Sequence, residues 1–152
     1  MNRARLEHGK RVVERLRDAG VADAKKEGQD VLHMDDWGHA RDCGTIACLG
    51  GWFSLDPHFR EQGLKNARDT TPNTTSLVPC YQDRTAYSAL ALFFDIDNVA
   101  AHHIFAGWNT NRWDDAVERI DDVLEGRDGD ELRIARLEQE NRLYAGWAVS
   151  RE

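Results

Sequence analysis

Apolar residues recur at helical spacing along most of this chain, and polar or glycine-containing segments separate them. The clearest apolar stripe, which predicts an amphipathic helix, comprises Trp113, Ala116, Val117, Ile120, Val123 and Leu124. Leu6, Val13 and Leu16 share a face of an earlier helix that we expect to end near Gly20. A third stripe, which comprises Tyr87, Leu90, Ala91 and Phe94, predicts another helix.

Polar residues at the ends of these stripes indicate where helices begin and end. Asp97 is a suitable N-cap for a short helix over residues 98–106. Gly126 follows the clearest stripe and is typical of a helix C-terminus. Asp128 or Asp130 then begins the last predicted helix.

Two segments lack helical spacing. We interpret residues 31–42 as a loop or one short strand, and residues 59–83 as the longest irregular stretch, in which a short hairpin can form. No alternation of strands and helices appears. The sequence therefore predicts a single all-α domain over residues 1–152. We expect a compact bundle of five or six helices around a helix from Cys43 to Leu55, with a short β-hairpin as the main exception.

The predicted central helix is rich in small residues. Gly44, Cys48 and Gly51 fall on one helical face, and each internal glycine costs about 0.8–1 kcal/mol relative to alanine. Two interpretations explain this pattern. Either another helix packs closely against this face, or a ligand or partner approaches the backbone there.

The run CGTIACLGGW, which starts at Cys43, resembles the Cys-Gly-Thr-x-Ala-Cys-x-x-Gly-Trp element of small uncharacterised proteins of bacteriophages and bacteria. The run FDIDNVAAHHIF, which starts at Phe94, is similar to a later element of those proteins. The resemblance spans roughly residues 37–125. It implies a phage or mobile-element origin, and a small binding protein that acts on a host or bacterial protein.

The charge balance bears on nucleic-acid binding. The chain carries 20 basic and 27 acidic residues, a formal net charge of −7. Binding to nucleic acid depends on neutralising phosphates, so an acidic chain is a poor candidate. Basic residues nevertheless outnumber acidic ones before residue 27, which leaves weak nucleic-acid binding through the N-terminal helix as an alternative.

The expected location is the cytoplasm. The N-terminus has no apolar core of a signal peptide, and no apolar run approaches the roughly 20 residues that span a bilayer. Three cysteines are an odd number, which argues against a disulfide framework.

Cysteine and histidine residues suggest two further chemistries. The spacing His39-x3-Cys43-x4-Cys48 lacks the tight Cys-x2-Cys pairs of structural zinc sites, so we expect neither a metal nor another cofactor. Cys43 at a helix N-terminus would have a lowered thiol pKa. A cysteine-dependent enzyme that uses Cys43 with His102 or His103 is therefore an alternative function.

The favoured hypothesis is a non-enzymatic binding protein whose partner is a protein or a small ligand. The predicted site combines helix-start donors, aromatic surface and titratable groups, and its residues are Trp37, His39, Cys43, Gly44, Thr45, His102 and His103. The acidic pair Asp121-Asp122 is interpreted as part of a solvated stripe.

Overall fold

The structure is a computed structural model that describes residues 1–21, 31–32, 39–41, 44–68, 77–106 and 112–150. For residues 31–32, 39–41, 44–47, 68, 77 and 143–150 it describes the backbone alone. All statements below concern these parts of the chain.

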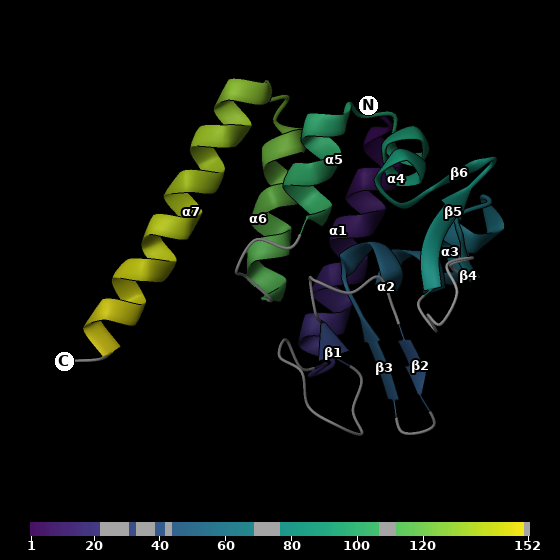
Figure 1. The fold of residues 1–152 in the computed structure, drawn as a ribbon, viewed down its shortest axis with the longest axis horizontal. Coiled ribbons are helices and arrows are strands. Elements are labelled where there is room, and N and C mark those ends of the chain that lie inside the picture. The colour runs from purple at the N-terminus through teal and green to yellow at the C-terminus, as the bar shows by residue number, and fades with distance from the viewer. Residues whose placement is uncertain (22–30, 33–38, 42–43, 69–76, 107–111, 151–152) are drawn as a thin grey trace.

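Helices make up most of the described chain, as Figure 1 shows. They are α1 (Arg3–Asp18), α2 (Leu49–Leu55), α3 (Pro57–Glu61), α4 (Ala86–Phe94), α5 (Asn98–Phe105), α6 (Trp113–Leu124) and α7 (Gly129–Ser150). None of the described helices is long and apolar enough to cross a membrane. The fold is therefore mostly helical, as predicted, but it is not purely α.

Two small three-stranded sheets accompany the helices. The first contains β1 (Val31–Leu32), β2 (His39–Arg41) and β3 (Gly44–Ala47) in the order β1-β3-β2, with β1 parallel and β2 antiparallel to β3. The second contains β4 (Lys65–Arg68), β5 (Leu77–Tyr81) and β6 (Arg84–Thr85), and its neighbouring strands are antiparallel.

The predicted helix from Cys43 to Leu55 is wrong in its first half. Residues 44–47 form β3, and the helix begins at Leu49 after Cys48, which has an extended backbone. Thr45 and Ile46 are β-branched and favour strands. Gly44 weakens a helix, so strand pairing with β1 and β2 replaces the first helical turn.

The segment interpreted as irregular contains more structure than expected. The hairpin that we allowed within residues 59–83 is present as β4 and β5. The short helix α3, however, was missed. Its N-cap Asp56 accepts a hydrogen bond from the amide of Phe59, and Pro57 occupies the first helical turn. This pair is a typical helix start that we interpreted only as a helix end.

The core is centred on phenylalanines. Phe53, Phe59, Phe93, Phe94 and Phe105 are each at most 1% exposed, and their rings meet mostly edge to face. Such contacts contribute about 0.5–1.5 kcal/mol per pair beyond burial. This cluster joins α2, α3, α4 and α5, against which α1 also packs.

Helix α7 packs on this core along one side only. Over residues 129–142, where its side chains are described, the buried residues of α7 are Leu132, Ala135 and Gln139, and the helix contacts α5 and α6. Asp128 caps it by accepting a hydrogen bond from the amide of Glu131, as the sequence predicted. In Figure 1 the far end of α7 diverges from α6 and leads away from the other helices.

Candidate functional site

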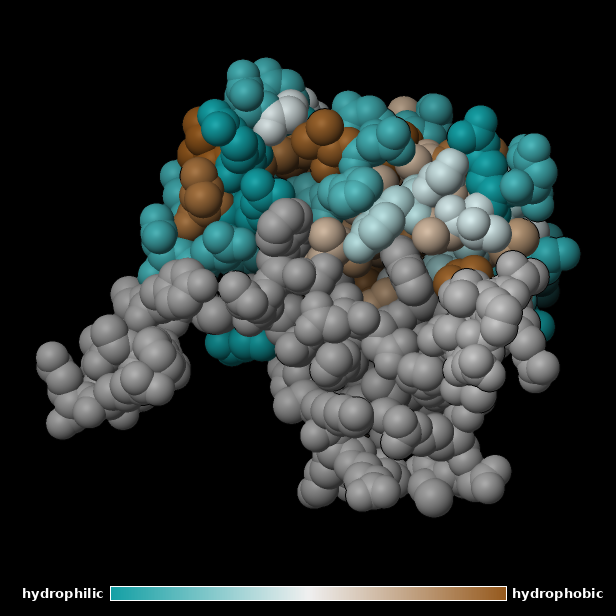
Figure 2. Space-filling view, viewed as in Figure 1, coloured by the Kyte–Doolittle hydropathy of each residue, from teal (hydrophilic) through white to brown (hydrophobic). Residues whose placement is uncertain are grey.

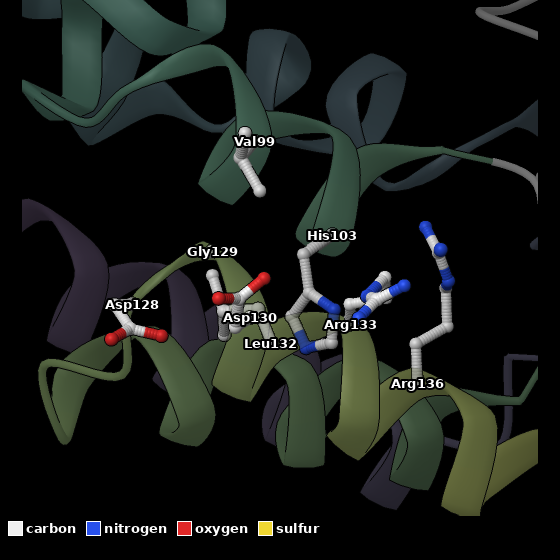
Figure 3. Close-up of a pocket in the computed structure, with 8 residues that line it drawn as sticks. All are labelled: Val99, His103, Asp128, Gly129, Asp130, Leu132, Arg133 and Arg136. Carbon is white, nitrogen blue, oxygen red and sulfur yellow. The ribbon is translucent and has the colours of Figure 1, made fainter.

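A pocket of about 580 Å³ lies between α5 and the first half of α7. Its wall includes Val99 and His103 of α5 together with Asp130, Leu132, Arg133 and Arg136 of α7. Figure 3 shows His103 reaching from α5 toward α7, with the two arginines on one side of it and Asp128 and Asp130 on the other. The pocket thus has an acidic end and a basic end.

A buried hydrogen bond holds His103 in place. Its Nε2 donates a hydrogen bond of 2.8 Å to Oδ2 of Asp122 on α6, and the two side chains are 3% and 9% exposed. Arg127 lies 3.3 Å from the other oxygen of Asp122. A buried carboxylate with two partners fixes the ring orientation of the histidine. The His103 ring is therefore a fixed part of the pocket wall.

Another group of buried polar side chains lies between α6 and α7. The guanidinium of Arg119 on α6 is 1% exposed and donates hydrogen bonds to Gln139 Oε1 (2.9 Å) and to the carbonyl oxygen of Ala106. Burial lowers the pKa of Arg119, the charge of Asp115 raises it, and the nearby charge of Arg136 lowers it. The charges of Glu140 and Glu118 also raise it, so carboxylates as well as Arg136 surround the buried guanidinium.

Asp115 precedes Arg119 by four residues on α6. Burial raises its pKa, while the charges of Arg112 and Arg119 lower it. Its Oδ2 atom is buried and has no hydrogen-bond partner among the described residues. Asp115 therefore compensates the charge of Arg119 only in part.

A second pocket, of about 420 Å³, lies on the other side of α7. Its wall includes Asp121 and Asp122 of α6 with Glu138 and Arg142 of α7. Because His103 lines the first pocket and Asp122 the second, their hydrogen bond passes beneath α7. Helix α7 is thus supported by polar side chains and flanked by open space on both sides.

The first pocket is suited to binding rather than to holding a metal. No group of three or more His, Cys, Asp or Glu side chains that could hold a metal ion occurs in the described residues. Two arginines instead provide donors for a carboxylate or phosphate group. The acidic end, with Asp130, can accept a hydrogen bond from an amine or hydroxyl group.

A similar set of side chains occurs elsewhere in the described chain, and it lines neither of the two pockets described above. His8 Nε2 of α1 lies 2.9 Å from Asp56 Oδ2, and Arg15 lies 3.2 Å from Oδ1. Burial raises the pKa of Asp56. Hydrogen bonds from His8, the amide of Phe59 and Arg15 together lower it by more than burial raises it, so the net shift is downward. His8 also packs against His58 and Phe59. This set caps α3 and ties it to α1.

The predicted site residues fall into three groups. His103 belongs to the pocket, whereas His102 is exposed, donates from Nδ1 to the carbonyl oxygen of Asn98 and stacks on Tyr87. Trp37 and Cys43 lie outside the described residues.

The third group lies on the first sheet. The backbones of His39, Gly44 and Thr45 belong to β2 and β3, and Ala40 is the register partner of Thr45. Figure 1 draws this sheet on one side of α2 and α5 on the other. A site that joins these residues with His102 or His103 stays a prediction.

The basic side chains of α1 make contacts within the chain. Arg5 donates to Gln62 and to the carbonyl oxygen of Phe93, and lies 4.1 Å above the Phe93 ring. Lys10 pairs with Asp121, and Arg17 pairs with Asp114. Several of the basic side chains that suggested nucleic-acid binding are thus already paired within the chain.

Sequence reasoning missed most of the pocket. It placed Asp122 in a solvated stripe, yet this carboxylate is buried, with a hydrogen bond from His103 on one oxygen and Arg127 beside the other. Arg133 and Arg136 received no role. Their spacing of three residues on one helix was a detectable signal, but nothing in the sequence indicated that α5 would face them.

No protein-family model, curated protein or solved structure matches this chain. The resemblance to phage and bacterial proteins therefore stays a prediction.

Proposed function

We propose that this protein is a non-enzymatic binding protein that takes a small anionic molecule in the pocket between α5 and α7. The observation that carries the proposal is the gathering of Arg133, Arg136 and the fixed His103 ring around one cavity. A ligand with a carboxylate or phosphate at the arginine end and an amine or hydroxyl near Asp130 matches this polarity.

Electrostatics support this ligand class at the basic end of the pocket. Arg133 and Arg136 both line it, and an anion bound there would interact with two positive charges in surroundings that screen charges less than bulk water does. Binding would also stabilise the fold, because the ligand contacts the native protein alone.

The described wall of the pocket supports binding over catalysis. It contains charged, apolar and imidazole groups, but no Ser, Thr, Cys or Lys side chain among the described residues. A His–Asp pair acts as a general base on such nucleophiles in many enzymes. Here the pair is better explained as a positioning device for the pocket wall.

Calorimetric titration with inorganic phosphate and with succinate tests the proposal. We expect saturable binding of at least one probe, with a dissociation constant of about 1 mM or lower, and at least tenfold weaker binding by Arg136→Gln. The control is Arg60→Gln, which removes an exposed positive charge on α3 and should bind as the wild type does. Equal losses in both variants, or no binding of either probe, would contradict the proposal.

A further inference from the structure

Two large apolar side chains lie on the outer face of α7, away from the helices against which it packs. Ile134 is 52% exposed and Leu137 is 48% exposed, although both lie on a helix that already buries Leu132 and Ala135. Figure 2 shows hydrophobic atoms at the outer edge of α7, beside hydrophilic ones. An amphipathic helix with a single partner has one apolar face. The second face of α7 therefore requires its own explanation.

Helix geometry places the two faces opposite each other. At 3.6 residues per turn, Ile134, Leu137 and Asn141 fall within about 60° of one another, roughly opposite the buried Leu132 and Gln139. All three are exposed. The outer face thus consists of an isoleucine, a leucine and an asparagine at intervals of three and four residues.

These intervals match a heptad. With Ile134 at position a, Leu137 takes position d and Asn141 the next a, while Arg133 and Glu138 take the flanking positions g and e. Isoleucine at a with leucine at d favours two-stranded parallel coiled coils. A single asparagine at an a position specifies register and the dimeric state.

The flanking charges fit the same arrangement. In a parallel pair of helices, position g of one strand lies beside position e of the partner five residues further along. Arg133 would therefore face Glu138 of a second copy. Because the dimer has twofold symmetry, this ion pair would occur twice. Both side chains are exposed, and neither lies within ion-pair distance of an opposite charge in the part of the chain that the structure describes.

We infer that the outer face of α7, defined by Ile134, Leu137 and Asn141, binds the same face of a second copy of this chain in a short parallel coiled coil. The far end of α7 leads away from the other helices in Figure 1, which leaves room for a partner helix. The interface is short, so the dimer is a weak one. Ile134 and Leu137 do not line the proposed anion pocket, whereas Arg133 lines it and also takes position g, so self-association is measured without phosphate or succinate.

Sedimentation equilibrium of the full chain at about 1 µM to about 1 mM measures the self-association. We expect a reversible monomer–dimer equilibrium that Leu137→Glu abolishes. The matched control Leu92→Glu changes a leucine on α4 that is 40% exposed, and should dimerise as the wild type does. Helical content from circular dichroism shows whether each variant is folded. A wild-type chain that stays monomeric at about 1 mM, or a folded Leu137→Glu variant that still dimerises, would overturn the inference.

A charge exchange tests the parallel orientation. Arg133→Glu and Glu138→Arg each place like charges side by side in the parallel dimer, so each should weaken dimerisation severalfold, and the double variant should restore it. In an antiparallel dimer, residue 133 of one copy would face residue 133 of the other, and residue 138 would face residue 138. The double variant would then dimerise no more strongly than the single variants. A dimer that is insensitive to all three variants would also overturn the parallel arrangement.

Discussion

Two buried carboxylates of this protein have nearly the same partners and very different surroundings. Asp56 binds His8 and Arg15, and Asp122 binds His103 and Arg127, each with a histidine on one oxygen and an arginine on the other. Aromatic rings surround the first set. The second set borders a cavity of about 580 Å³ that contains two more arginines.

The difference teaches that the partners of a charge do not define its role. At Asp56 the carboxylate caps α3 and joins α1 to it, so its contribution is to the free energy of unfolding. At Asp122 the same chemistry fixes a histidine at the wall of an open pocket. The first pocket beside His103, rather than the composition or the exposure of the set, distinguishes the candidate binding site from the structural contact.

The largest expected effect comes from Asp56→Ala. It removes the N-cap of α3 and leaves the imidazole of His8 without its acceptor, so the free energy of unfolding should fall by about 3 kcal/mol. Urea denaturation measures the change, and phosphate affinity should stay at the wild-type value. A variant as stable as the wild type would mean that Asp56 has no capping role.

Asp122→Ala should affect anion binding more, and stability less, than Asp56→Ala does. Water in the adjoining pockets can take over the hydrogen bond of His103, so we expect a smaller loss of about 1–2 kcal/mol in urea denaturation. Phosphate or succinate binding should weaken about tenfold, because His103 loses its fixed orientation. Unchanged anion affinity in a folded variant would show that the pair does not support the pocket.

Two glycines compare how tightly each region is packed. A Cβ atom at Gly9 would lie 3.0 Å from Cζ of the buried Phe53, whereas one at Gly129 would lie 3.6 Å from Cγ1 of the half-exposed Val99. Overpacking should outweigh the gain in helix propensity for Gly9→Ala, with a net loss of about 1 kcal/mol. Gly129→Ala should leave the melting temperature nearly unchanged. The reverse order in thermal denaturation would contradict the packing contrast.

The smallest effect concerns acid stability. The pKa of Asp56 is lowered in the folded chain. Its contribution is therefore complete above the unfolded-state value near 3.8, and it is lost as the pH falls through the lower folded-state pKa. Asp56→Asn should lose less stability than the wild type between about pH 5 and pH 3. Parallel pH profiles of the two proteins in urea would contradict this assignment.

Local signals in the sequence predicted the ends of helices well. Asp97 and Asp128 cap α5 and α7 through their own side chains, and such caps depend on residues three positions away. Residues 44–47 were assigned wrongly because pairing with strands distant in the sequence decided their conformation.

The candidate site was less accessible from the sequence. His103 was identified, but its partner Asp122 lies 19 residues away on another helix, and Arg136 comes from a third. Only tertiary packing brings these charges together. Neither periodicity nor composition contains that information, so the sequence could suggest His103 as a candidate without its role.

The most direct test of the anion pocket is nuclear magnetic resonance of the histidine rings during titration with inorganic phosphate at constant pH. Resonances of His103 and His8 are assigned by their loss in His103→Gln and His8→Gln. The account predicts that the His103 ring shifts saturably with phosphate and that the His8 ring, which has the same kinds of partner but does not line the arginine pocket, does not. Equal shifts of both rings, or no shift of His103 at saturating phosphate, would contradict it.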